Sequence, residues 1–100
     1  MAKAAKLYIE NRMPFPVYVL LHAEAGELNI HIYAQPFSNA EAIAPNMVTG
    51  FPANAAMRSC YDRRDRLSYT IHVHGCTVMF VGGDQRYADG PIFSIRDPRN

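Results

Sequence analysis

Residues 17–34, VYVLLHAEAGELNIHIYA, predict a β-hairpin, because apolar residues alternate on both sides of a turn-like segment. A hairpin loop at residues 24–27, EAGE, would place Val19 opposite Ile32 and Leu21 opposite Ile30. Directly opposite residues of an antiparallel pair share a face, and a shift of one residue would exchange the faces. The sequence therefore predicts an apolar face of Val17, Val19, Leu21, Ala23, Leu28, Ile30, Ile32 and Ala34, and an outer face of Tyr18, Leu20, His22, Asn29, His31 and Tyr33.

Residues 69–80, YTIHVHGCTVMF, show the same alternation. We predict a second hairpin with a two-residue turn at His74 and Gly75, in which the glycine supplies a positive φ angle. This register pairs Val73 with Cys76, and residue 69 with residue 80, on an apolar face. The alternative is one strand over residues 67–81, which would point His72, His74 and Cys76 to one side but exceeds the usual strand length.

Shorter patterns complete the prediction. KLYIEN at residues 6–11 alternates like a strand, the two prolines in residues 12–16 make that segment a connection, and IFSI at residues 92–95 predicts a last strand. Between residues 35 and 66, Ser38 and Glu41 match a helix-capping box. A helix over residues 53–62 is predicted from the apolar spacing of Ala53, Ala56, Met57, Cys60 and Tyr61.

These elements predict one domain over residues 1–100 that is mainly β. We expect a small antiparallel β-sandwich or a partly open barrel of five to seven strands with one short helix. The alternative is an α+β fold, in which the helix packs on one face of an antiparallel sheet. The predicted core consists of Val19, Leu21, Ile30, Ile32, Tyr69, Ile71, Val78 and Phe80.

Composition excludes several functions. Of the 100 residues 49% are apolar, which is enough for one core, and a net charge of +1 offers no field to attract nucleic acid in general. No apolar run is long enough to span a membrane and no export signal is visible, so we expect a cytoplasmic protein with Cys60 and Cys76 reduced. No motif of a nucleophilic enzyme or a phosphate-binding loop is present, which favours a protein that is not an enzyme.

The histidines are the candidate metal ligands. His22 and His31 lie diagonally on the outer face of the first predicted hairpin. The pair His72-Val73-His74 is similar to the first motif of the cupin family, whose pattern continues with a glutamate and a later histidine; neither follows here. Our main expectation is no cofactor. The alternative is a metal-binding or metal-dependent small β-barrel enzyme that uses His22, His31, His72 and His74 to hold zinc or another divalent transition metal.

The middle segment suggests a binding surface. It carries bulky apolar residues in a turn-rich context, followed closely by arginines, and this combination is enriched at the centres of protein interfaces. We therefore expect a small non-enzymatic domain that binds a partner protein stoichiometrically, as an inhibitor, immunity or adaptor protein does. The predicted partner-binding residues are Phe37, Met47, Phe51, Arg58, Arg63 and Arg64.

Overall fold

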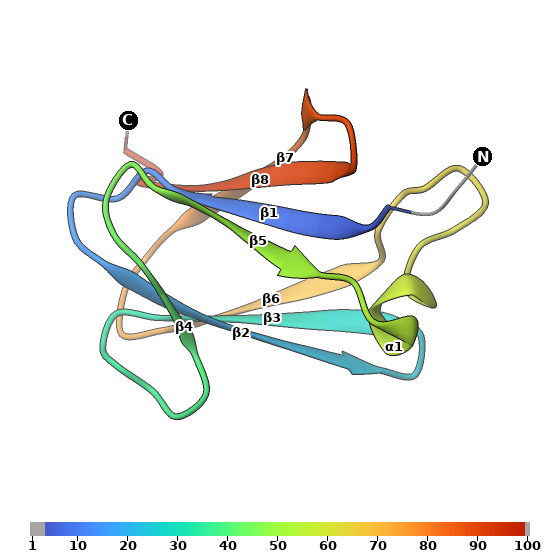
Figure 1. Ribbon diagram of the computed structural model, residues 1–100. Helices are drawn as coiled ribbons and strands as arrows, with labels where there is room; N and C mark the ends of the chain where they lie inside the picture. Colours follow the sequence, from blue (N-terminus) through green and yellow to red (C-terminus); the bar gives the residue numbers. More distant parts are fainter. Residues whose placement is uncertain (1–3, 100) are drawn as a thin grey trace.

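Two four-stranded sheets pack face to face as a sandwich (Figure 1). The computed structural model describes residues 4–99, and at residues 83–85 it describes the backbone only. The first sheet has the order β5 (Val48–Pro52), β1 (Lys6–Asn11), β8 (Gly90–Arg96) and β7 (Met79–Tyr87). The second sheet has the order β4 (Glu41–Ile43), β2 (Val17–Glu24), β3 (Glu27–Tyr33) and β6 (Tyr69–His74), and the helix α1 (Ala55–Arg58) follows β5 in the chain.

The predicted mainly β class is confirmed, with two corrections of detail. Residues 4–99 form eight strands rather than five to seven, and neither sheet is purely antiparallel. β1 pairs in parallel with β8, and β3 pairs in parallel with β6. Parallel neighbours cannot be joined by a tight turn, so these pairs unite strands that lie far apart in the sequence. Over the same residues, no helix is long and apolar enough to cross a bilayer.

The first hairpin has the predicted register. Val19 lies opposite Ile32 and Leu21 opposite Ile30, and the apolar residues face the other sheet. The turn is tighter than the predicted four residues because Glu24 pairs with Glu27. Ala25 and Gly26 have positive φ angles of 55° and 77°, as a type I′ turn requires. This turn matches the twist of the strands it joins.

The second predicted hairpin is wrong. β6 pairs with β3 in the second sheet and β7 pairs with β8 in the first, so residues 75–78 carry the chain from one sheet to the other. Gly75 does have the predicted positive φ, 81°, but the bend at this glycine lies in the connection between the two sheets and not in a hairpin turn. Tyr69 and Phe80 do meet, edge to face at 5.6 Å, across the interior of the sandwich. Alternation identified the inward faces of both strands, but it could not show which strands pair.

The middle segment contains two strands that the sequence did not predict. Ser38 and Glu41 do not cap a helix, since Asn39 takes a positive φ of 64° and β4 begins at Glu41. The predicted helix over residues 53–62 shortens to α1, four residues long. Asn54 begins α1 by accepting a hydrogen bond from the main-chain N–H of Met57 at 2.8 Å.

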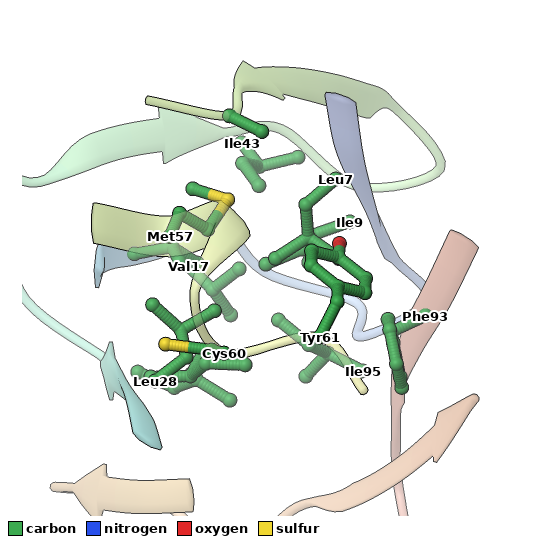
Figure 2. Packing of buried hydrophobic residues seen from close by; sticks show 14 of the residues in the cluster. Leu7, Ile9, Val17, Leu28, Ile43, Met57, Cys60, Tyr61, Phe93 and Ile95 are labelled. Carbon is green, nitrogen blue, oxygen red and sulfur yellow. The ribbon is translucent and has the colours of Figure 1, made fainter. Parts of the chain in front are cut away.

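The core lies between the sheets and draws on nearly every element (Figure 2). Each fully buried leucine or isoleucine stabilises the fold by roughly 1.5–3 kcal/mol relative to an exposed one. All eight predicted core residues belong to this cluster, although five of them are only partly buried. The buried members are Leu7, Ile9, Met13, Val17, Val19, Leu28, Ile30, Ile32, Ile43, Ala53, Met57, Cys60, Tyr61, Phe93 and Ile95.

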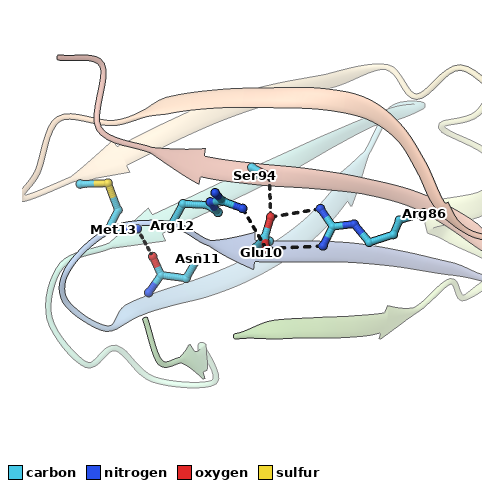
Figure 3. Close-up of polar contacts among 6 residues, drawn as sticks. All are labelled: Glu10, Asn11, Arg12, Met13, Arg86 and Ser94. Carbon is cyan, nitrogen blue, oxygen red and sulfur yellow. Dashed lines mark hydrogen bonds and ion pairs between the residues drawn. The ribbon is translucent and has the colours of Figure 1, made fainter. Parts of the chain in front are cut away.

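Asn11 ties one end of the sandwich together although it is fully buried (Figure 3). Its Nδ2 donates to the carbonyl oxygens of Phe15 and Ile43, each at 2.8 Å. Its Oδ1 accepts from the N–H of Met13 at 2.8 Å, and its main chain bonds to the connection between β4 and β5. One amide thus joins the end of β1, the connection into β2 and the end of β4.

Replacing Asn11 with Ala should destabilise the fold by about 3 kcal/mol, because one buried carbonyl, one partly buried carbonyl and one N–H lose their partner. Asn54→Ala is the matched control, and loss of this cap should cost only about 1 kcal/mol. Urea unfolding of the two variants measures both values. Equal losses would show that Asn11 has no special role.

Candidate functional site

The parallel pairing of β3 with β6 gathers three histidines on the outer face of the second sheet. His31 lies beside His72, and Tyr33 beside His74. Their side chains point away from the core because Ile30 and Ile32, which alternate with them, are buried. Phe37, in the loop after β3, joins them by stacking on Tyr33. We call His31, Tyr33, Phe37, His72 and His74 the ring face.

The aromatic and imidazole rings of the ring face stack in four layers. Phe37 stacks on Tyr33 with ring centres 4.1 Å apart and planes 5° apart. Tyr33 stacks on His74 at 4.3 Å and 11°, and His31 stacks on His72 at 4.5 Å and 14°. The third layer holds His31 and His74 together. Adjacent rings therefore fix one another's orientation, which favours a preorganised surface.

His31 and His74 share a layer because they hydrogen-bond edge to edge. His31 Nδ1 lies 3.0 Å from His74 Nε2. The two ring planes are 17° apart. The distance between the ring centres, 5.3 Å, is close to the sum of the nitrogen–nitrogen distance and the two ring radii, as expected for rings that lie edge to edge. Two neutral imidazoles can make this bond, one donating and the other accepting, whereas two doubly protonated rings cannot.

A regular ladder of side-chain hydrogen bonds runs along the same two strands. Glu27 accepts from Thr70, and Asn29 Oδ1 lies 2.9 Å from His72 Nε2. The third rung is the pair of His31 and His74, and each rung joins a residue of β3 to the residue 43 positions later. The constant spacing follows from the parallel register, in which Glu27, Asn29 and His31 each reach the equivalent diagonal neighbour on β6.

The surroundings of His31 keep it neutral. Burial lowers the pKa of His31 below the ordinary 6.5, and the nearby His72, His74 and His22 lower it further. His22, on β2, is exposed and lies 3.2 Å from Glu24. At neutral pH His31, in the middle of the ring face, is therefore uncharged.

Of the four predicted metal-ligand candidates, the structure brings three together and leaves His22 apart. Among the side chains that the structure describes, those of residues 4–82 and 86–99, no three His, Cys, Asp or Glu are placed as a ready group of metal ligands. The two closest ring nitrogens, on His31 and His74, face each other and are engaged in their hydrogen bond. An ion could bind them only if that bond were broken.

The six predicted partner-binding residues do not form one surface. Phe37 belongs to the ring face, and Met47 is exposed in the connection between β4 and β5. Phe51 is partly buried against the core rather than free. The three arginines follow from the end of α1 onward, and Figure 1 places α1 at the opposite end of the sandwich from the loop after β3. The six residues belong to one segment of the sequence, but the extended strand β5 separates the first of them from the arginines.

Glu10 is a buried carboxylate on the outer side of the first sheet (Figure 3). It accepts from Ser94 at 3.0 Å and contacts Arg86 at 3.4 Å and Arg12 at 3.5 Å. Burial raises the pKa of Glu10, but the bonds from Arg86 and Ser94 and the charge of Arg12 outweigh it, so the pKa is lowered. Because these neighbours surround the carboxylate, its role is to fix β1, β7 and β8 together.

Two cavities open where the chain passes from β6 to β7. Their volumes are about 520 and 330 Å³, and both are lined by Phe15, Gly75 and Cys76. Burial raises the pKa of the Cys76 thiol, which keeps it protonated at neutral pH. The thiol in this recess therefore lacks the activation that a nucleophile needs.

Comparisons with known proteins assign no family. No protein-family model matches the chain. No curated protein and no solved structure matches it either.

Acid should weaken the fold through His31. Because its folded pKa lies below 6.5, its contribution to stability is complete above about pH 6.5 and is lost as the pH falls toward the folded value. We expect the urea midpoint to fall between pH 7.5 and 5.5, and to fall less in His31→Gln. His22→Gln, outside the ring face, should change the pH dependence less than His31→Gln, because His22 makes the smallest of the contributions that lower the pKa of His31. Identical pH dependence in all three proteins would contradict this role of His31.

Proposed function

We propose that this chain is a small non-enzymatic domain that binds a partner protein stoichiometrically and holds it on the ring face. The observation that carries the proposal is the partly exposed stack of four aromatic and imidazole layers. Phe37, the outermost ring, is 51% exposed although it is large and apolar. Clustered rings of this kind are the side chains that concentrate binding energy in protein interfaces.

Two further properties support this proposal. The rings are already ordered by stacking and by the hydrogen-bond ladder, so a partner would immobilise few free side chains on binding. His31 is uncharged at neutral pH and the ring face contains no lysine or arginine, which suits the uncharged, aromatic or aliphatic centre of a partner protein better than a nucleic acid backbone. The roles included in the proposal are those of an inhibitor, an immunity protein or an adaptor.

The proposal includes a cytoplasmic location. The two cysteines, Cys60 and Cys76, are both free. Reduced thiols are typical of proteins in the cytosol.

Phe37→Ala should weaken binding by about 2 kcal/mol, roughly thirtyfold, and leave the fold intact. Met47→Ala is the matched control, because Met47 is similarly exposed at 57% but lies outside the ring face. The partner would be recovered from the native host by cross-linking, and its affinity for each variant measured by calorimetry. Loss of binding in Met47→Ala with retention in Phe37→Ala would reject the ring face as the binding surface.

A divalent transition metal is the second candidate ligand, favoured by the 3.0 Å separation of His31 Nδ1 and His74 Nε2. Two imidazole nitrogens each about 2.0–2.1 Å from zinc can lie this close together, so His31 and His74 would supply two ligands of the ion. The ion would replace the hydrogen bond between the two rings.

Calorimetric titration with Zn²⁺ and Ni²⁺ on protein without a histidine tag tests this candidate. Binding at micromolar or lower concentration that is lost in His31→Ala and His74→Ala, but kept in His22→Ala, would favour a metal-binding function. Absence of binding, or equal binding in all three variants, would exclude a metal site at these rings.

A further inference from the structure

The four strands at the sheet edges differ in how they are protected against pairing with another chain. β4 has only three residues, β5 ends in Pro52, and β7 has register shifts on either side of Asp84. Short strands, prolines and bulges are the usual devices that prevent a free edge from pairing. β6 has none of them. It is a regular six-residue strand, YTIHVH, without proline, glycine, lysine, arginine or an acidic residue.

The free hydrogen-bonding groups of β6 belong to alternate residues. The carbonyl oxygens of Ser68 and His74 accept from β3, so the even-numbered residues direct their main-chain groups toward β3. Tyr69, Ile71 and Val73 therefore direct their N–H and C=O groups outward. Within residues 4–99, none of these groups has a main-chain partner.

We propose that β6 pairs with β6 of a second copy of this chain, antiparallel and about a two-fold axis at Ile71. This axis aligns the free groups of both copies, since Ile71 meets its own counterpart and Tyr69 meets Val73. Three residues from each copy contribute one donor and one acceptor each, which gives up to about six main-chain hydrogen bonds. The two second sheets become one continuous sheet.

The side chains of β6 are self-complementary in that register. Inward-facing Tyr69 and Val73 lie opposite each other, an aromatic and β-branched pair that stabilises antiparallel strands. On the outer face, Thr70 lies opposite His72, so no like charges meet at neutral pH. An axis shifted by one residue, to Thr70 or His72, would keep the two faces matched but would align only two free residues of each copy, which gives about four main-chain hydrogen bonds instead of about six. The register is thus determined by β6 itself, which is why a second copy fits.

Exposure along β6 points to the same surface. Val73 faces the interior side of the sheet, opposite buried Ile32, and is nevertheless 36% exposed. A strand added beside β6 would cover it. The proposal is independent of the proposed function, because the ring face extends outward from the sheet and the new contact lies along its edge.

Sedimentation equilibrium over a concentration series tests the dimer, with Val73→Lys as the variant. A lysine at the edge introduces like charges and should raise the dissociation constant of the dimer by about tenfold or more. Val81→Lys is the matched control, because Val81 is 39% exposed but lies on β7. It should leave the dimer unchanged.

Hydrogen exchange adds a signature specific to the register. The amides of Tyr69, Ile71 and Val73 should become protected as the concentration rises, whereas those of His72 and His74, already bonded to β3, should not change. A protein that stays monomeric, assembles beyond two copies, or loses its dimer equally in both lysine variants would overturn the proposal. So would concentration-dependent protection that does not alternate along β6.

Discussion

The parallel pairing of β3 with β6 is the constraint on which both the ring face and the free edge of the second sheet depend. It places His31 beside His72 and Tyr33 beside His74, and it sets the diagonal offset that repeats in all three hydrogen-bond rungs. The same pairing leaves β6 at the border of the sheet with its alternate main-chain groups directed outward. One strand thus supplies rings to a face and hydrogen-bonding groups to an edge.

Buried polar residues hold the rest of the sandwich in place. The amide of Asn11 closes one end by joining β1, the connection into β2 and the end of β4. Glu10, next to it in β1, links the same strand to Ser94 of β8 and Arg86 of β7 on the opposite side of the sheet. Burying such groups is favourable only when they are satisfied, so both positions depend on their whole set of neighbours.

The packing of the histidines in the ring face depends on their charge. Neutral imidazoles can stack and share a hydrogen bond, and the low pKa of His31 preserves that state near neutral pH. The candidate site could be predicted only in part from the sequence. The outer face of the first hairpin identified His31 and Tyr33, whereas the predicted second hairpin placed His74 in its turn, and only the alternative single strand put His72 and His74 on one side. Nothing in the sequence indicated that these strands are neighbours, or that Phe37 folds back onto Tyr33.

The sequence by itself determined what depends on residues close together in the chain. Period-two alternation predicted the register of the first hairpin and the inward faces of β6 and β7. The first hairpin could be predicted because its strands are consecutive in the chain and are joined by the short turn at Ala25 and Gly26. Tertiary structure alone decided which distant strands pair: it joined β6 to β3 and β7 to β8, replaced the second hairpin by a crossover, and separated the predicted partner surface. The physical reason is that alternation reports which face of a strand is apolar, whereas the choice of neighbour depends on how two whole sheets pack over one core.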